Sequence, residues 1–217
     1  MAGVCTIIGA GPGLGRSIAE RFAYGGYSVG LIARDARRLE DQAAKLRARG
    51  QQSAVASADA GNPDSLRRAI SSVENKLGAS TSILVYNAVS FAPGSPTQLS
   101  PEALDADYRV NVTGALVAAQ SVVPGMKQAG SGTILLTGGG LALHPNAQAA
   151  SLSLGKAGTR CLAFLLSQEL RPAGIRVATI TICGYIQHGT HFDPLRIAEV
   201  FYQTAIDGRS DVEIVYR

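Results

Sequence analysis

The stretch VCTIIGAGPGLGR at residues 4–16 decides the fold, because it joins an almost wholly apolar run to a glycine-rich turn. An apolar run without alternation is typical of a strand that is buried on both faces of a parallel sheet. The turn contains Gly9, Gly13 and Gly15, with Leu14 where the form G-x-G-x-x-G would place its third glycine. Such a turn at the start of a helix lets the backbone approach a pyrophosphate. The stretch therefore predicts a nucleotide-binding strand–turn–helix unit, and a tight turn without a ligand is the alternative.

The rest of the chain repeats this alternation of strand and helix. We expect strands at residues 4–8, 27–33, 53–57, 82–86, 133–137, 176–182 and 212–215. We expect helices at residues 14–24, 36–49, 63–77, 101–128, 149–171 and 194–204. Asn62-Pro63 and Ser100-Pro101 have the pattern of a capping residue followed by proline at a helix start. The order predicts a single doubly wound α/β domain over residues 1–217, with a mostly parallel seven-stranded sheet in the order 3-2-1-4-5-6-7 and helices on both faces.

Composition excludes several classes of protein. The chain has 217 residues, of which 46% are hydrophobic and 17% charged, so an intrinsically disordered protein is excluded. No apolar run is long enough to span a bilayer, and the N-terminus has no basic region of the kind that begins a signal peptide. Cys5, Cys161 and Cys183 lie in apolar segments, which predicts three reduced, buried thiols. These features together predict a soluble, cytoplasmic protein with no membrane partner.

The positive charge of the chain is concentrated in its first quarter. The formal net charge is +4, and residues 1–49 carry eight Lys or Arg against four Asp or Glu. No aromatic residues alternate with these cations, so a nucleic-acid partner is not expected. The surplus is either a solvated helix face or the binding region of a small anionic ligand. We favour the anionic ligand because of the adjoining glycine-rich turn.

Arg34 follows the end of the second expected strand, at a position that discriminates between nucleotide ligands. An acidic residue near this point accepts a hydrogen bond from the 2′-hydroxyl of a ribose, whereas an arginine suits a 2′-phosphate. Asp35 comes one residue too late for the usual acid. The sequence therefore predicts NADP(H) rather than NAD(H), and a plain surface charge is the alternative.

Further motifs extend the pattern over nearly the whole chain. Asp59-Ala60 follows the third strand, Asn87-Ala88 follows the fourth, and Asn111 precedes Gly114 within the expected helix 101–128. With the glycine-rich turn, these motifs resemble those of the short-chain dehydrogenase/reductase family. The resemblance implies a Rossmann-type fold, a small-molecule substrate and a homodimer or homotetramer joined through helices 101–128 and 149–171. It implies cofactor contacts from Gly9, Gly11, Gly13, Leu14, Gly15, Arg34, Asp59, Ala60, Asn87, Ala88, Lys156, Gly184 and Ile186.

The chain departs from the family at the positions that handle the substrate oxygen. The family has a Ser, a Tyr thirteen residues later and a Lys four residues after the Tyr. Lys156 matches the Lys, which places Leu152 at the Tyr position and Gly139 at the Ser position. The resemblance implies that Lys156 and Asn111 remain beside the cofactor, while the usual proton donor and its hydroxyl neighbour are missing.

Several other residues are candidates to replace the missing Tyr. Tyr185 is the main candidate, because the resemblance places the segment after the sixth strand over the nicotinamide. His144, Tyr86 and the pair Ser151 and Ser153 are further candidates, each with packing or a solvated loop as the alternative. Segment 183–211, which borders the substrate in the family, is short here, and its His188 and His191 predict no metal site.

Two functions therefore remain open at the level of sequence. One is an atypical oxidoreductase that transfers hydride between NADP(H) and a small carbonyl compound or alcohol. The other is a catalytically impaired NADP(H)-binding protein that acts as a sensor or a regulatory partner.

Overall fold

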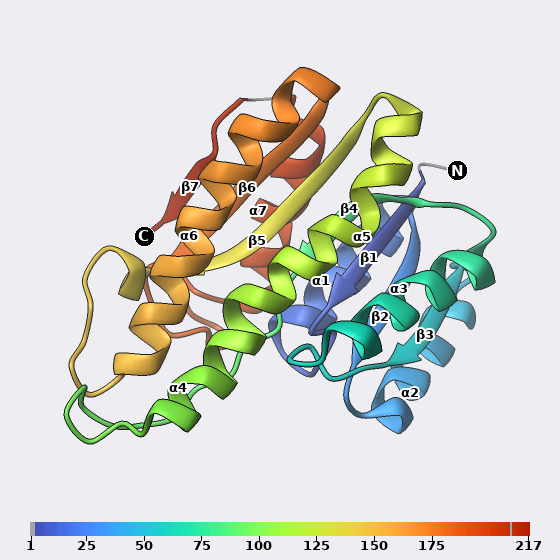
Figure 1. The fold of residues 1–217 in the computed structure, drawn as a ribbon. Helices are drawn as coiled ribbons and strands as arrows, with labels where there is room; N and C mark the ends of the chain where they lie inside the picture. Colours follow the sequence, from blue (N-terminus) through green and yellow to red (C-terminus); the bar gives the residue numbers. More distant parts are fainter. Residues whose placement is uncertain (1–2, 209) are drawn as a thin grey trace.

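Seven strands form one sheet in the order β3-β2-β1-β4-β5-β6-β7 (Figure 1). The computed structural model describes residues 3–208 and 210–217. Every neighbouring pair of strands is parallel. The strands are β1 (Val4–Ile8), β2 (Ser28–Ala33), β3 (Ser53–Ser57), β4 (Thr81–Tyr86), β5 (Gly132–Gly139), β6 (Ile175–Ile182) and β7 (Glu213–Tyr216). The predicted strand order is confirmed, and no described pair is antiparallel.

Helices cover both faces of the sheet. One hydrophobic cluster joins the sheet to α1, α2 and α7, and a second joins it to α3, α5 and α6 on the opposite face. Figure 1 shows α3, α5 and α6 in front of the sheet with α1 and α7 behind it. The helices are α1 (Leu14–Tyr24), α2 (Ala36–Arg47), α3 (Pro63–Leu77), α4 (Pro101–Tyr108), α5 (Gly114–Ala129), α6 (Ala150–Leu170) and α7 (Pro194–Ile206), with 3-10 turns at Gly140–Ala142 and Arg171–Ala173.

The helix starts predicted from Asn62-Pro63 and Ser100-Pro101 are confirmed. The Asn62 side chain accepts a hydrogen bond from the backbone N–H of Ser65 at 3.0 Å. The Ser100 hydroxyl accepts one from the N–H of Ala103 at 3.2 Å. These caps satisfy N–H groups that would otherwise lack partners in the first turn.

The expected helix 101–128 is interrupted by a π-helical turn at Arg109–Thr113, labelled η1, which lies between α4 and α5. The Tyr86 hydroxyl donates a hydrogen bond to the carbonyl oxygen of Val110 within this turn. Gly114 closes the turn, and a side chain there would collide with the Tyr86 hydroxyl and the carbonyl oxygen of Ala60. The turn also carries Asn111, and π-turns of this kind are frequent at functional sites.

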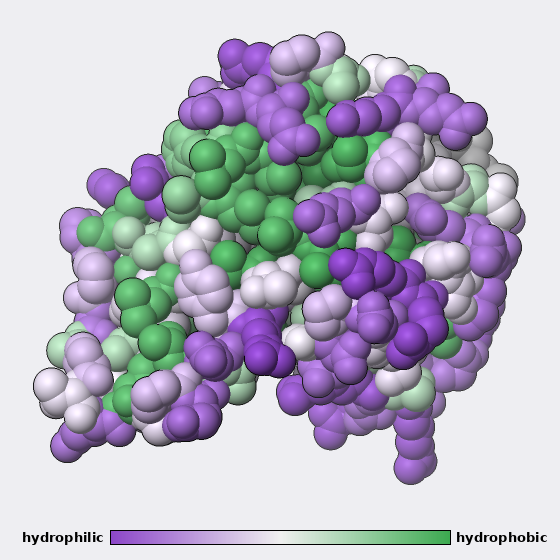
Figure 2. All heavy atoms as spheres, in the orientation of Figure 1, coloured by the Kyte–Doolittle hydropathy of each residue, from purple (hydrophilic) through white to green (hydrophobic). Residues whose placement is uncertain are grey.

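The prediction of three buried thiols is wrong for two of the cysteines. Cys5 is buried, and burial raises the pKa of its thiol. Cys183 is half-buried and Cys161 is exposed. Cys161 lies on the outer face of α6, where Leu154 and Leu165 are exposed as well. Figure 2 shows a broad hydrophobic area over α5 and α6. An apolar sequence could not indicate burial here, because α6 is apolar on both of its faces.

In the described chain, no helix has the length and apolar character needed to cross a membrane.

Candidate functional site

The predicted site residues gather at the edge where the parallel strands have their carboxyl ends. Ile8 ends β1, Tyr86 ends β4, Gly139 ends β5 and Ile182 ends β6. In open α/β sheets, ligands bind outside these ends at the point where the strand order reverses. In this sheet that point lies between β1 and β4, which are neighbours.

The glycine-rich turn is held against the end of β4. Gly9 has φ 84°, and a Cβ atom there would lie 2.5 Å from the backbone nitrogen of Ala88. A Cβ atom on Gly15 would collide with the carbonyl oxygen of Gly9. The Asn87 amide donates a hydrogen bond to that same oxygen at 3.0 Å, and its own oxygen accepts one from the Thr137 hydroxyl at 3.0 Å. Packing therefore requires glycine at positions 9 and 15.

The middle of the turn, in contrast, faces open space. A Cβ atom on Gly11 or on Gly13 would meet nothing within 4 Å. Gly13 is the N-cap residue of α1, no side chain caps this helix, and its first turn contains no acidic residue. Uncapped N–H groups at the positive end of a helix dipole favour an anion.

A groove of about 330 Å³ runs from this turn along α2 as far as Lys45. Arg34 lines it and is exposed, and its guanidinium makes no ion pair within the described residues. Asp35 caps α2 by accepting a hydrogen bond from the N–H of Arg38, so its carboxylate is already engaged. The groove is lined by Ala10, Gly11, Pro12, Arg16, Ala33, Arg34, Asp35, Arg38, Leu39, Asp41, Gln42 and Lys45.

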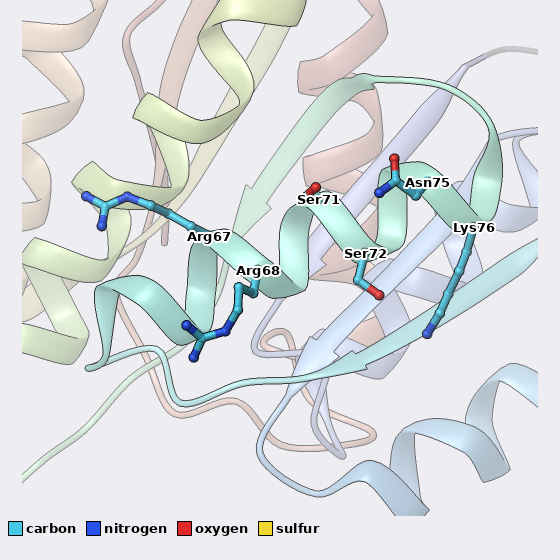
Figure 3. A pocket seen from close by; sticks show the side chains of 6 residues that line it. All are labelled: Arg67, Arg68, Ser71, Ser72, Asn75 and Lys76. Carbon is cyan, nitrogen blue, oxygen red and sulfur yellow. The ribbon is translucent and has the colours of Figure 1, made fainter.

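A larger hollow, of about 540 Å³, lies on the outer face of α3. It is lined by Arg67, Arg68, Ser71, Ser72, Asn75 and Lys76 (Figure 3). Arg67 pairs with Asp64 at 3.0 Å, and the Lys76 amino group donates to the carbonyl oxygen of Val55 at 2.7 Å. In Figure 3 the side chains of Arg67 and Lys76 lie at opposite ends of the row and do not converge. This hollow brings together none of the predicted site residues.

Lys156 lies beneath the ends of β5 and β6. The residue is half-buried, and its amino group donates a hydrogen bond to the carbonyl oxygen of Thr137 at 2.7 Å. Burial of the amino group lowers its pKa to about 8, because a low-dielectric environment disfavours the charged form. Leu152 lies one turn earlier on α6 and is half-buried.

Gly139 adjoins the Lys156 side chain. A Cβ atom at position 139 would lie 3.4 Å from Cγ, Cδ and Cε of Lys156, which is ordinary van der Waals contact. The backbone of Gly139 is extended, with φ −160° and ψ 149°, a conformation that any residue adopts. The structure therefore leaves room for a side chain at position 139.

Asn111 is buried and joins three segments of the chain. Its side chain accepts a hydrogen bond from the backbone N–H of Ser90 at 2.9 Å and donates one to the carbonyl oxygen of Ser90 at 2.8 Å. Its backbone carbonyl accepts a hydrogen bond from the Thr159 hydroxyl at 2.9 Å. Gly155 allows this approach, since a Cβ atom there would lie 2.6 Å from Nδ2 of Asn111.

Sequence reasoning missed Asp107, which holds the same segment. This carboxylate is buried and accepts two hydrogen bonds of 2.6 Å, one from the Ser90 hydroxyl and one from the backbone N–H of Ala92. The only signal in the sequence is its place one helical turn before Asn111.

Most of the proposed proton donors are engaged in other hydrogen bonds or are exposed. Tyr86 is wrong as a candidate: it is buried among the side chains between the sheet and α5, and burial raises the pKa of its phenol. The Ser151 hydroxyl bonds to the backbone of Ala92, and the Ser153 hydroxyl to that of Asn146. Tyr185 is 94% exposed.

The remaining predicted residues border this edge. His144 is exposed. Asp59 accepts a hydrogen bond from the N–H of Gly61 at 2.9 Å beyond β3, and Ala60 follows it. Gly184 packs against the Phe192 ring so closely that a Cβ atom there would collide with it, and the neighbouring Ile186 is exposed.

Segment 183–211 is held by contacts within its own loop and with β7. Its loop is held by a hydrogen bond from the N–H of Gln187 to the carbonyl oxygen of Phe192 at 3.1 Å. The His191 ring stacks on Tyr216 with 4.7 Å between centroids. Arg209, within this segment, lies outside the described residues. Across residues 3–208 and 210–217, no three His, Cys, Asp or Glu side chains gather as a metal site would require.

Comparison with known proteins assigns the pattern to one family. A model of the short chain dehydrogenase family matches residues 3–194. The 2,3-dihydro-2,3-dihydroxybenzoate dehydrogenase of Bacillus subtilis (strain 168) is 28% identical over 76% of this chain and 64% of that protein. A very-long-chain 3-oxoacyl-CoA reductase of Aspergillus clavatus is 32% identical over 80% of this chain and 51% of that protein. The chain thus spans less than two thirds of the length of these two curated relatives.

Solved structures share the fold over the whole chain. A short-chain dehydrogenase from Rhodopseudomonas palustris superposes with a TM-score of 0.88 at 22% identity, covering 99% of this chain and 98% of that one. A metagenomic short-chain oxidoreductase in complex with NADP superposes with a TM-score of 0.87 at 24% identity, covering 98% of this chain and 95% of that one.

Proposed function

The chain belongs to the short-chain dehydrogenase family, and on that premise we propose that it is an oxidoreductase that uses NADP(H) rather than NAD(H). Its substrate is a small carbonyl compound or the corresponding alcohol. The observation that carries the proposal is the groove between the glycine-rich turn and α2, where Arg34 has no ion pair within the described residues. The metagenomic relative of this fold, solved with NADP, supports the choice of cofactor.

The residues at this edge fit a nicotinamide dinucleotide. Open space around Gly11 and Gly13, together with the uncapped start of α1, suits a pyrophosphate. Leu14 and Gly15 begin that helix, so their backbone N–H groups would be donors to the pyrophosphate. Arg34 would meet a 2′-phosphate with its planar array of donors. The other proposed contacts are Gly9, Asp59, Ala60, Asn87, Ala88, Lys156, Gly184 and Ile186.

The chain's own residues would do the remaining work. The bound nicotinamide supplies or accepts a hydride, and the chain must orient the substrate and handle the proton on its oxygen. Asn111 fixes the segment after β4 through Ser90, so it acts by positioning that segment. The Lys156 amino group donates a hydrogen bond to the carbonyl oxygen of Thr137, and the Lys156 side chain adjoins Gly139, which has no side chain of its own.

Cofactor choice is tested by titrating the protein with NADPH and with NADH and following the fluorescence of the reduced nicotinamide. Arg34→Ala is expected to weaken NADPH binding by about 10- to 100-fold and to leave NADH binding unchanged, because a charged hydrogen bond contributes about 1.5–3 kcal/mol. Arg37→Ala is the matched control, since Arg37 is exposed in the first turn of α2, three residues after Arg34, and does not line the groove. An unchanged preference for NADPH in Arg34→Ala would contradict the assignment.

A second function is favoured by the side chains at the reacting end. Gly139 and Leu152, which we place at the Ser and Tyr positions of the family, offer no proton, while Tyr185 and His144 are exposed. A protein with this site could bind NADP(H) as a sensor or a regulatory partner without turning over a substrate. Restoring the two missing side chains separates these functions, because only a binding protein without turnover would gain activity from nothing.

We also propose a homodimer or homotetramer formed through α5 and α6. The outer face of α6 exposes Leu154 by 50% and Leu165 by 57%, and Leu116 is exposed on α5. Figure 2 shows that these helices carry a broad hydrophobic area. Exposed apolar area of this extent is typical of a protein–protein interface.

A further inference from the structure

Three long segments of the chain carry no charged residue. Residues 77–101, 128–155 and 177–192 contain no Asp, Glu, Lys or Arg. They include β4, β5, all of β6 after Arg176 and the loops that follow these strands at the carboxyl edge of the sheet (Figure 1). Each of the three loops therefore begins beside the proposed nicotinamide position without bringing a fixed charge to it.

The three loops touch one another and form one surface. The backbone N–H of Gly94 donates to the carbonyl oxygen of Gln148 at 3.4 Å, and that of Ala92 donates to the Ser151 hydroxyl at 3.2 Å. A Cβ atom on Gly140 would lie 3.1 Å from Cα of Cys183. We call the loops at residues 87–100, 139–149 and 183–192 the neutral surface. Its exposed large hydrophobic side chains are Val89, Phe91, Tyr185 and Ile186.

Lys156 is the cation that borders the neutral surface, beside Gly139, and the other charged groups at its border are engaged in hydrogen bonds or exposed. Both carboxylate oxygens of Asp107 bond to the segment after β4. Asp193 accepts hydrogen bonds from the N–H groups of Gly189 and Leu195, which lower the pKa of its carboxyl. Arg196 is exposed on the first turn of α7. The groove beside β2 is the opposite case, because it is lined by several cations.

We infer that the substrate is an uncharged, mainly apolar carbonyl compound or its alcohol; this rests on the proposed function. Lys156 serves the reacting oxygen, so a carboxylate or phosphate elsewhere on the substrate finds no partner cation on this surface and loses its hydration without compensation. An apolar skeleton gains from contact with Val89, Phe91 and Ile186. The two halves of the carboxyl edge thus select a charged cofactor on one side and a neutral substrate on the other.

A matched set of ketones tests this inference. The probes are cyclohexanone, 4-oxocyclohexanecarboxylate and the methyl ester of that acid, each measured for NADPH-dependent reduction and, by saturation-transfer NMR, for binding to the protein loaded with NADP+. We expect cyclohexanone and the ester to exceed the carboxylate by about tenfold or more in kcat/KM and in affinity. A carboxylate that equals or exceeds the ester overturns the inference, and so does a failure of all three to bind while NADPH binds. Failure to bind NADPH would instead overturn the proposed function.

Added charge provides a second arm. Phe91→Lys places a cation on the neutral surface at an exposed position and is expected to reduce the preference for the ester by about tenfold. Val89→Lys is a second variant at an exposed position of the same loop. Ile206→Lys adds the same charge at the end of α7, near the opposite edge of the sheet, and is expected to leave the preference unchanged. An equal effect of Phe91→Lys and Ile206→Lys would contradict the assignment of the surface.

Lys156 has a separate feature that bears on the proton. An ammonium group has three N–H donors, and Lys156 uses one of them on the carbonyl oxygen of Thr137. Gly139 leaves the stem of this side chain uncovered from the end of β5. Position 152, one turn earlier on the same face of α6, carries a leucine that can neither give nor accept a proton.

We propose that the Lys156 amino group itself exchanges the proton with the substrate oxygen, which also rests on the proposed function. In the direction of reduction, hydride from the reduced nicotinamide forms the new C–H bond and the carbonyl π pair moves to oxygen. That oxygen takes a proton from the ammonium group, and the neutral amine regains a proton from water. In the direction of oxidation, the neutral amine accepts the hydroxyl proton.

The pH dependence follows from the surroundings of Lys156. The titratable or charged groups on the elements packed against α6 are Glu102, Asp105, Asp107 and Tyr108 of α4, Arg109 of η1, Arg171 of η3 and Arg176 of β6. On α6 itself are Cys161, Glu169 and Arg160, and Arg160 pairs with Glu213 at 2.7 Å. None of them shifts the pKa of Lys156, which burial alone lowers to about 8. Reduction needs the ammonium form, so its rate should fall as pH rises through about 8, and oxidation should gain over the same interval.

Lys156→Arg tests the proton role, because arginine keeps the charge and does not deprotonate near neutral pH. We expect it to keep NADPH binding but to lose about 10²- to 10⁴-fold in kcat at saturating NADPH. NMR of protein labelled at lysine Cε, without cofactor, should show Lys156 titrating near 8. Retained turnover with an unchanged pH profile, a Lys156 titration near 10, or NADPH binding without any turnover by the native chain would each overturn the proposal.

Discussion

Restoring a serine and a tyrosine at positions 139 and 152 should raise carbonyl reduction strongly. A serine at 139 fits, because its Cβ atom would make ordinary contact with the Lys156 stem at 3.4 Å and the backbone is already extended. We therefore expect Gly139→Ser to change the free energy of unfolding by less than about 1 kcal/mol. A tyrosine at 152 lies one helical turn from Lys156, whose positive charge favours the ionised phenol. A placed general acid contributes about 10²- to 10⁴-fold.

The assay is NADPH oxidation with cyclohexanone for the native chain and for Gly139→Ser/Leu152→Tyr. The matched control is Gly139→Ser/Leu152→Phe, which adds the same ring without the hydroxyl. We expect the Tyr variant to exceed the Phe control by about 10²-fold or more. If both variants fold and bind NADPH but turn over equally, positions 139 and 152 are not those of the Ser and Tyr. A native chain that is silent while the Tyr variant is active would favour the sensor or regulatory function.

Three further predictions address stability and assembly. Asp107→Ala should lower the free energy of unfolding by about 2–4 kcal/mol in urea denaturation, because two hydrogen bonds to a buried carboxylate are lost. The control is Asp105→Ala, at an exposed position of the same helix, which should change the free energy of unfolding little. Between pH 8 and pH 10.5, the free energy of unfolding of the native chain should rise by about 3 kcal/mol relative to that of Lys156→Met, because the folded state binds fewer protons at this lysine than the unfolded state. If the difference in free energy of unfolding between the two proteins does not change with pH, the lowered pKa is contradicted. Leu165→Glu should dissociate the proposed dimer in light scattering, whereas Leu195→Glu, equally exposed on α7, should not.

The sequence predicted the fold well because parallel strands are nearly continuous apolar runs. All five residues of β1 are buried, as are all but one of β2. The continuous apolar runs and the glycine-rich turn were therefore enough to predict where these strands lie in the sequence. The predicted cap residues Asn62 and Ser100 are also confirmed. What the sequence did not predict is the π-turn at Arg109–Thr113, which depends on a contact between Tyr86 and Val110 across the interior.

The candidate site was predicted less completely, because it too depends on contacts between segments that are far apart in the chain. Asn111 could be named from the sequence, but its hydrogen bonds to Ser90 and those of Asp107 join segments far apart in the chain. Burial was wrongly predicted at Cys161, because α6 is apolar on both faces. It was also wrongly predicted at Tyr86, whose hydroxyl donates a hydrogen bond to a backbone carbonyl oxygen in the interior. Periodicity reports which faces of an element are apolar, whereas only the fold shows which of them is covered.

The glycines at the end of β5 differ in what the fold demands of them. A Cβ atom on Gly138 would lie 2.6 Å from the Thr179 hydroxyl and 2.9 Å from that of Thr181, so packing against β6 requires glycine there. Gly139, the next residue, has extended backbone and room for a side chain beside Lys156. Since packing does not account for glycine at position 139, the lack of a side chain there acts on the space next to the Lys156 amino group. If this amino group protonates the substrate oxygen, as we propose, the rate of reduction should fall over the pH interval in which Lys156 loses its proton.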